Sequence, residues 1–192
     1  MSTAPPPAAT PAPARRSFVE RVIGALRLDA TTYDEIEHDP TALGQAAGVV
    51  AGAAIAAAIG ASGQGGSAVG AVLGSLFGWL VSTGFIWVVG VFWLKHTSDY
   101  RELLRTLGFA SAPQLGMVLS GIPVLGGLVT LAVTLWSLAA FVVAVRQALD
   151  VTTGRAVVVC VLAVLVNIAC IVGLVMLFGG VLGRTGGAAV GF

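Results

Sequence analysis

The side chains best suited to chemistry lie in one acidic segment, residues 29–40. Five of them are of types that bind divalent metals or transfer protons: Asp34, Glu35, Glu37, His38 and Asp39. A catalytic metal site would need further ligands, and the sequence holds no second cluster of His, Cys, Asp and Glu. With His38 and His96 as the two histidines, no Ser or Cys nucleophile has an evident base. The sequence therefore predicts a protein that is not an enzyme, without catalytic, cofactor-binding or metal-binding residues.

Ionisable groups deep in an apolar segment would mark an ion or substrate path. None is present, because the ten basic and nine acidic side chains all lie in tails, loops or segment ends. Asn167 is the strongest hydrogen-bonding group at such depth, and we expect it to bond to a neighbouring helix. Cys160 and Cys170 are about 15 Å apart along one helix, too far for a disulfide between them.

The composition places most of the chain in a membrane. Of the 192 residues, 57% are hydrophobic and 10% are charged, whereas a soluble domain has about 25% charged residues. We expect an all-α integral membrane protein, because several apolar runs reach the roughly 18 residues that a span needs. The third of its spans is short and contains Pro113, where a kink is expected. The five predicted transmembrane helices cover about residues 41–62, 67–94, 106–122, 124–145 and 156–182.

Polar segments flank this membrane domain. The helix expected from Ser17 to Leu28 is amphipathic, a pattern that suits a helix lying on an anionic leaflet and equally one packed on the protein's own spans. Asp39 and Pro40 are suited to start the first span, since a carboxylate caps free amides and proline fits a first turn. The predicted organisation is a disordered Pro/Ala-rich tail at 1–16, the cytoplasmic amphipathic helix and acidic segment at 17–40, the five-span domain at 41–183 and a short Gly-rich tail at 184–192.

Basic residues alternate between rich and empty connections, as a five-span topology requires. Cytoplasmic connections retain Lys and Arg, and the alternation places nine of the ten on the side of the N-terminus. A four-span alternative, with residues 106–122 as a re-entrant loop, keeps eight of the ten on that side. We therefore expect a cytoplasmic N-terminus and a plasma-membrane location. The net charge of +1 gives no long-range attraction for nucleic acid.

Small residues recur at four-residue spacing in the first two spans. Between helices in lipid, such residues permit close approach of the backbones. We expect the two stripes to pack as an antiparallel hairpin, with homodimerisation through the same stripes and plain compositional bias as the alternatives. The stripes consist of Gly44, Gly48 and Gly52 in the first span and Gly66, Gly70, Gly74 and Gly78 in the second.

Three pieces of the sequence resemble the Yip domain family of Ypt/Rab-interacting proteins, and in particular its prokaryotic branch. They are Asp29, Tyr33, Glu35, Ile36, Asp39 and Pro40 before the first span, Arg105, Gly108 and Pro113 at the third, and Arg146 and Asp150 between the last two. The resemblance implies a five-span membrane protein with a cytoplasmic N-terminus. Eukaryotic members bind Rab-type GTPases, but this sequence has a short Pro/Ala tail where those carry a long cytosolic region, so Rab binding is not carried over.

The expected function is that of a non-enzymatic, Yip-type membrane protein that organises or recruits partners. The acidic segment and the helix with Arg101 and Arg105 share the cytoplasmic side, where they could dock on each other or bind a protein partner. The expected partners of the chain are the lipid bilayer, a protein at the cytoplasmic face and a second copy of the chain. The rival hypothesis is a small transporter or lipid-handling protein with a groove beside Pro113 and the Gly121–Gly127 turn.

Overall fold

The computed structural model describes residues 15–61, 68–93 and 98–187. Gly66, Lys95, most of the predicted 1–16 tail and the end of the predicted 184–192 tail lie outside these ranges. The described chain is all-helical, as the sequence predicts, and no strand occurs in it. In chain order the elements are α1 (Phe18–Leu26), α2 (Ala30–His38), α3 (Ala42–Gly60), α4 (Ala68–Val88), the π-helical turn η1 (Val89–Trp93), α5 (Tyr100–Ala110), the 3-10 helix η2 (Ala112–Gly121), α6 (Gly126–Ala148) and α7 (Thr153–Gly187).

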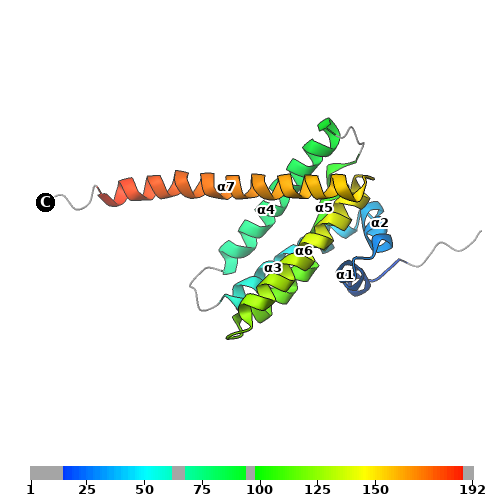
Figure 1. Ribbon diagram of the computed structural model, residues 1–192, viewed down its shortest axis with the longest axis horizontal. Coiled ribbons are helices and arrows are strands. Elements are labelled where there is room, and N and C mark those ends of the chain that lie inside the picture. Colours follow the sequence, from blue (N-terminus) through cyan, green and yellow to red (C-terminus); the bar gives the residue numbers. More distant parts are fainter. Residues whose placement is uncertain (1–14, 62–67, 94–97, 188–192) are drawn as a thin grey trace, which may run out of the picture.

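Two short helices, α1 and α2, form an N-terminal hairpin, residues 18–38, at one end of the molecule (Figure 1). Ser17 starts α1 through a capping box, in which its hydroxyl accepts from the Glu20 amide and the Glu20 carboxylate accepts from the Ser17 amide at 2.7 Å. α1 is buried through Arg21, Gly24 and Ala25. Of its apolar side, Phe18 meets the ring of buried Phe109 edge to face, with centroids 6.2 Å apart, but Phe18, Val19 and Ile23 each stay more than 40% exposed. The helix therefore packs on the protein by one face and leaves large apolar side chains open on the other, so a position on the membrane surface stays a prediction.

The turn between α1 and α2 is closed by backbone geometry. Leu28 has a positive φ of 59°, which lets the Asp29 amide donate to the Gly24 carbonyl at 3.0 Å. The Asp29 carboxylate then caps α2 by accepting from the Thr31 amide, also at 3.0 Å. A side chain on Gly24 would overlap Thr32, so the absence of a Cβ is what allows α1 and α2 to lie so close.

Four of the five predicted spans are present as long apolar helices. In the described chain, the helices long and apolar enough to cross a membrane cover Ala42–Gly60, Ala68–Phe92, Gly126–Ala148 and Thr153–Cys170. Many of their large apolar side chains are exposed, including those of Phe77, Leu131 and Leu165. An outward-facing apolar surface of this kind is stable in hydrocarbon and not in water.

The predicted third span, residues 106–122, is not one continuous α-helix. α5 ends at Ala110, and the chain continues as η2, with Pro113 in its first turn. Proline has no amide hydrogen and clashes with the preceding turn, which explains why the α-helix stops here instead of kinking. A methyl group on Gly108 would meet Ala46 near the start of α3, and one on Gly121 would meet the Gly60 carbonyl at its end. Together, α5 and η2 therefore run alongside α3 from one end to the other.

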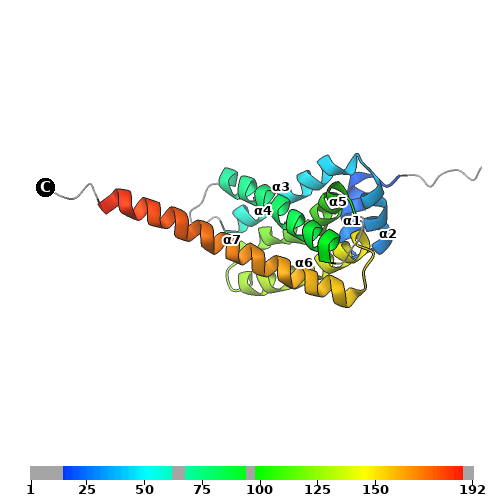
Figure 2. The same ribbon diagram turned by 90° about the horizontal axis from the view of Figure 1, so that it is seen from above.

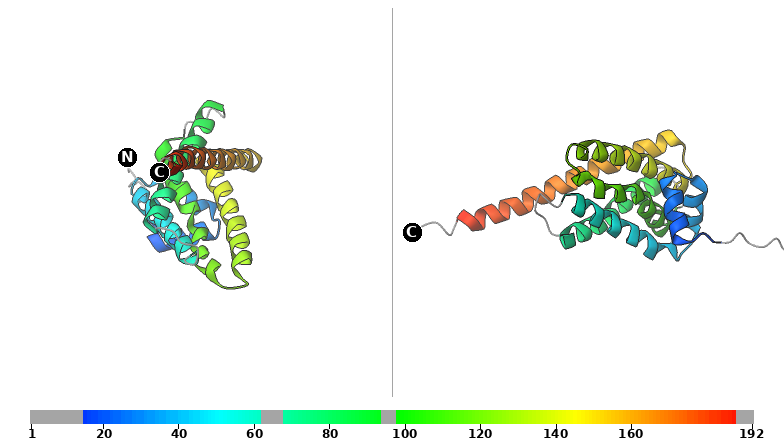
Figure 3. Two further views of the ribbon diagram at one scale, coloured as in Figure 1. Left: turned by 90° about the vertical axis from the view of Figure 1, so that its left-hand side faces the viewer. Right: turned by 90° about the horizontal axis from the view of Figure 1, so that it is seen from below.

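Helix α5 lies at the centre of the hairpin end of the bundle. Its last eight residues, 103–110, are all buried, and it contacts α1, α2, α3, α4 and α6. The first half of α7 packs along α6 and α4, while its far end projects beyond every other helix (Figures 2 and 3). The N-terminal hairpin covers the opposite end of the bundle.

The glycine stripes are not packed on each other at most of their described positions. A Cβ on Gly44, Gly48, Gly74 or Gly78 would meet no atom within 4 Å. Of the three stripe glycines in α3, Gly52 has a close neighbour, because a Cβ there would lie 3.4 Å from the Leu115 side chain of η2. The expected antiparallel hairpin packed through these stripes is therefore wrong at those four glycines, because α3 packs mainly against η2. Homodimerisation through the stripes stays a prediction.

Candidate functional site

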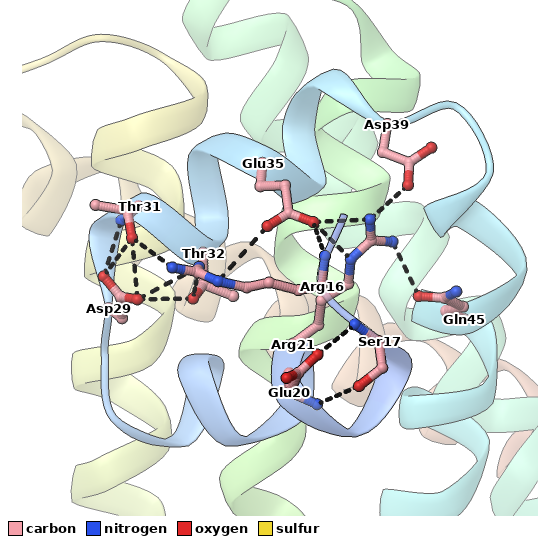
Figure 4. A network of polar contacts seen from close by, with 10 residues as sticks. All are labelled: Arg16, Ser17, Glu20, Arg21, Asp29, Thr31, Thr32, Glu35, Asp39 and Gln45. Carbon is pink, nitrogen blue, oxygen red and sulfur yellow. Dashed lines mark hydrogen bonds and ion pairs between the residues drawn. The ribbon is translucent and has the colours of Figure 1, made fainter. Parts of the chain in front are cut away.

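A buried arginine joins the N-terminal hairpin to the bundle. Arg21 on α1 is 2% exposed. Its guanidinium donates to Glu35 at 2.9 and 3.2 Å, to Asp39 at 2.6 Å and to the Gln45 side-chain oxygen at 3.1 Å (Figure 4). Glu35 lies on α2, Asp39 follows α2, and Gln45 lies on α3. One planar, multiply donating group therefore connects three consecutive elements.

A second arginine reinforces the hairpin. Arg16 donates to the hydroxyls of Thr31, at 3.0 Å, and Thr32. It also forms ion pairs with Asp29 at 3.4 Å and with Glu35 at 3.6 Å. We call the joined set the Arg21 network; its members are Arg16, Arg21, Asp29, Thr31, Thr32, Glu35, Asp39 and Gln45.

The charges in this network are mutually stabilised. Hydrogen bonds from the Thr41 hydroxyl and from Arg21 outweigh burial and lower the pKa of Asp39 to about 2. The Thr32 hydroxyl has the largest part in lowering the pKa of Asp29. Burial alone would lower the pKa of Arg21, but its bonds to Asp39 and Glu35 raise it. The carboxylates of Asp39 and Asp29 are therefore ionised near neutral pH and bonded to internal partners.

Sequence reasoning missed Arg21 as the centre of this site, although a signal was present. Arg21 shares one helix face with Gly24 and Ala25, at spacings of three and four residues. Two small residues beside a charged one indicate a face that lies against another element, whereas a solvated face has no need of them. Gly24 and Ala25 are indeed buried together with Arg21.

The basic helix does meet the acidic segment, through one residue of the predicted pair. Arg105 on α5 is buried and donates to the Glu37 backbone carbonyl, from Nε at 3.1 Å and also from Nη2. Arg101, one turn earlier, is exposed. The α5 helix thus docks on the hairpin through a backbone carbonyl at the end of α2. The nearby carboxylates of Glu35 and Asp39 already bind Arg21.

Four of the other predicted site residues have packing roles. Tyr33 and Ile36 on α2 are fully buried, and the Tyr33 hydroxyl donates to the Ala25 carbonyl at 3.4 Å. A Cβ on Gly108 would lie 2.6 Å from the Ala46 Cβ, so glycine is required where α5 crosses α3. Pro113 is buried at the start of η2. These residues hold the hairpin and α5 on the bundle and present no side chain to a partner.

The residues predicted between the last two spans lie at the end of α6. Arg146 is half-buried and donates to the Gln147 side chain at 3.3 Å. Gln147 in turn reaches the Ala30 carbonyl of the hairpin at 3.5 Å. Asp150 is exposed with a φ of 46°, and it allows the Val151 amide to bond back to the Arg146 carbonyl at 3.2 Å. Pro40, just before α3, is also exposed.

Three charged or titratable side chains at the hairpin end stay exposed, those of Asp34 and His38 on α2 and Arg101 on α5, and half-buried Glu37 lies beside the first two. We call these four residues the exposed polar face. His38 and Asp34 form an ion pair at 3.7 Å, and both side chains are exposed. Burial, reinforced by Glu102, Asp150 and Asp34 against the effect of His38, raises the pKa of Glu37 to about 7. The ligand atoms of Asp34, Glu37 and His38 lie within 4.8 Å of one another, a spacing that exposed acidic groups commonly reach without binding a cation.

Asn167 contacts a neighbouring helix, as its depth in the apolar run indicates. Its amide nitrogen on α7 donates to the Ser82 hydroxyl on α4. Ser82 in turn donates to the Gly78 carbonyl at 2.7 Å. This polar chain ties α7 to α4 where the surrounding side chains are apolar.

Comparison with known proteins agrees with this architecture. The family model described as the Yip1 domain matches residues 30–177, which run from the start of α2 into α7. No curated protein matches the sequence. No solved structure matches it either. The matched region holds α2, every apolar helix except the end of α7, and most of the predicted site residues. The chain therefore belongs to the Yip1 domain family of membrane proteins.

Proposed function

We propose that this protein is a non-enzymatic organiser that recruits a partner to the membrane through the exposed polar face. The carrying observation is the Arg21 network, because it holds α1 and α2 as a folded platform on the bundle. On that platform the exposed polar face keeps Asp34, His38 and Arg101 accessible. A preorganised surface binds at lower entropic cost than a disordered segment does.

We further propose that the hairpin end faces the cytoplasm of the cell and that the chain crosses the plasma membrane five times. The orientation is supported by Arg101, Arg105, Arg146 and Arg155, which lie on helix ends at or near the hairpin end. The fifth crossing is supported by the course of α5 and η2 along α3. Their 11 and 10 residues would extend over about 36 Å at 1.5 and 2.0 Å per residue, enough for a hydrocarbon core of about 30 Å.

The orientation can be tested by labelling single cysteines in intact cells. Thr152 and Arg155 are suitable positions, because both are exposed and lie where α6 is followed by α7. With a cytoplasmic hairpin, membrane-impermeant maleimide should label these positions only after the cells are opened. Labelling at full rate in intact cells would show that the hairpin end faces outward, and the proposed orientation would be wrong.

The recruiting function is tested by charge reversal on the exposed polar face. Asp34→Lys and Arg101→Glu change side chains that are not part of the Arg21 network. Substitutions at Glu35 or Asp39 would remove partners of Arg21 and so disturb the hairpin itself. Arg155→Glu, an exposed arginine on α7, is the matched control. Crosslinking and mass spectrometry in native membranes should show a partner attached to α2 or α5 that both test variants lose and the control retains.

If all three variants keep the same crosslinks, the exposed polar face is not a recruiting surface. The readout requires that the variants remain folded. Size-exclusion chromatography and thermal unfolding in detergent provide that check, since surface charge changes normally alter stability by less than about 0.5 kcal/mol.

The rival lipid-handling function has one structural observation in its favour. A cavity between the apolar helices is lined in part by Gln114 and Met117 of η2, one and four residues beyond Pro113. The Gly121–Gly127 turn does not line it. The groove expected beside Pro113 is thus supported on its η2 side.

A further inference from the structure

The outer side of α1, away from the bundle, carries large apolar side chains. The helix is held on the protein by Arg21, Gly24 and Ala25, which are all buried. At about 100° per residue, Val19 and Ile23 fall on the opposite side of the helix, and they are 61% and 41% exposed. A surface helix in water carries polar side chains on its outer side. The outer side of α1 is therefore suited to an apolar environment.

α1 lies crosswise to the long helices. In Figure 1 it is seen nearly along its axis, whereas α3 and α6 run across the view. An amphipathic helix bound to a membrane surface lies in the plane of the membrane and therefore has this orientation relative to helices that cross it.

The level of α1 along the bundle matches the edge of a bilayer core. Its Arg21 guanidinium donates to Gln45, three residues after the start of α3 at Ala42 and thus about 5 Å along that helix. α3 is apolar enough to cross a membrane, and its 19 residues extend over about 28 Å, close to the core thickness of about 30 Å. At this level α1 would lie at the boundary between headgroups and acyl chains.

Trp136 joins the end of α1 to the exposed apolar surface of α6. Its indole N–H donates at 2.9 Å to the Leu26 carbonyl, one of the groups that a helix end leaves without a partner in the helix. Trp136 is 44% exposed, and Leu135 beside it is 58% exposed. Tryptophan is enriched where a membrane meets water, because its ring is apolar and its N–H is polar. The surface by which α6 would face lipid therefore adjoins α1.

Arginines lie at both ends of α1. Arg27, directly after the helix, is exposed and has no side-chain partner among the described residues. Arg15, before the helix, has a 74% exposed side chain and forms an ion pair with Asp39 at the long distance of 3.8 Å. The exposed carboxylate of Glu20 accepts from the Ser17 amide in the capping box. Lipid phosphates pair with free guanidinium groups, whereas the apolar side of another helix does not.

We propose that α1 is embedded in the phospholipid leaflet on the hairpin side of the membrane. Phe18, Val19 and Ile23 lie among the upper parts of the acyl chains, and Arg27 lies at the level of the lipid phosphates. The bilayer then covers the side of α1 that the protein leaves open. This position involves neither the exposed polar face nor the direction in which the hairpin end faces, so its test is independent of the proposed recruitment.

The test uses the full chain in phosphatidylcholine nanodiscs with an environment-sensitive fluorophore on a single cysteine. The native thiols are first removed by Cys160→Ala and Cys170→Ala. Val19→Cys and Ile23→Cys place the fluorophore on the outer side of α1. Asp34→Cys is the matched control, because Asp34 is exposed on the other helix of the hairpin. Three quenchers are compared: a lipid with a nitroxide near the top of its acyl chain, a lipid with a nitroxide near the chain end, and iodide in the water.

At Val19 and Ile23 the fluorophore should emit at shorter wavelength than at Asp34. The upper nitroxide should quench it most strongly, and iodide should quench it least. At Asp34 the order should be reversed, with iodide as the strongest quencher. Thermal unfolding of each labelled chain in detergent should match that of the unlabelled parent, which shows that the fluorophore reports on the folded protein.

Three results would overturn the proposal. Iodide quenching at Val19 and Ile23 as strong as at Asp34 would mean that α1 faces water. Emission at short wavelength without quenching by either nitroxide would mean that protein, such as a second copy of the chain, covers this side. Strongest quenching by the nitroxide near the chain end would place α1 deep in the core and away from the lipid phosphates.

Discussion

Replacing Arg21 with methionine tests whether the buried guanidinium holds the hairpin on the bundle. Methionine keeps most of the apolar length and removes every donor. Breaking a buried ion pair by removing one partner costs about 3–5 kcal/mol. Here Asp39 keeps its 2.7 Å bond from the Thr41 hydroxyl, and the Glu35 side chain is 27% exposed. The lower figure therefore applies, about 3 kcal/mol.

That free energy should appear as local opening of the hairpin and leave the long helices folded. Hydrogen exchange measured by mass spectrometry in nanodiscs would show the amides of α1 and α2 exchanging about 100-fold faster, since 1.4 kcal/mol is a factor of ten. Arg27→Met is the matched control, because Arg27 directly follows α1, is exposed and has no side-chain partner in the described ranges. A change below threefold in Arg21→Met, or an equal change in Arg27→Met, would refute the reasoning.

Three further predictions concern residues near the same end. Gly108→Ala should lower the unfolding free energy in detergent by about 1–3 kcal/mol, because the new methyl group would meet Ala46 at 2.6 Å. The contribution of Glu37 to hairpin stability, measured by hydrogen exchange, should be fully present below pH 4.5, the ordinary pKa of Glu37, and be lost as the pH rises through about 7, because the folded state favours the protonated carboxyl; Glu37→Gln should remove this part of the pH dependence. Asp150→Gly should raise thermal stability by up to about 1 kcal/mol, since a φ of 46° strains any residue with a Cβ.

Each of these predictions has a control or a contrary outcome. Gly44→Ala, where a methyl group meets nothing within 4 Å, should be neutral or slightly stabilising. If it destabilises as much as Gly108→Ala, the α5–α3 contact is not the cause. Asp34→Asn keeps Glu37 and should keep most of the pH dependence. A loss of stability in Asp150→Gly would mean that the Asp150 carboxylate has a partner.

The homodimer alternative follows from the open glycines. Gly44 and Gly74 have free space where a neighbouring helix would fit. If a second copy packs there, leucine at either position should abolish energy transfer between labelled chains in liposomes. Unchanged transfer would remove the glycine stripes from any dimer interface.

The parts of the fold that could be predicted are those determined by residues close together in the sequence. The apolar runs at 41–62, 67–94, 124–145 and 156–182 predicted α3, α4, α6 and α7, because length and hydropathy suffice to identify a helix in lipid. The run at 106–122 did not reveal its own secondary structure, because hydropathy does not show that the α-helix ends before Pro113 and that a 3-10 helix follows. The packing predicted for the glycine stripes was wrong at four positions, because the spacing indicates a surface suited to close approach but does not determine which helix packs on it.

The candidate site shows the same division between residue type and partner. The sequence identified Glu35 and Asp39 as candidate interaction residues, and Arg105 as a basic residue on the same side of the membrane. It could not show that Arg21 occupies both carboxylates, because that contact joins α1 to residues 14 and 18 positions later across a reversed turn.

By itself, the sequence determined that this chain is a helical, multi-pass membrane protein of the Yip1 domain family, because solvent preference and motif order are properties of residues along the chain. The tertiary structure alone decided which charges stay available. Burial and geometry commit Glu35, Asp39 and Arg105 to holding the hairpin and leave Asp34, His38 and Arg101 outside. The physical reason is that a charged group removed from water must find its partner within the fold, and which partner it meets depends on how distant helices pack.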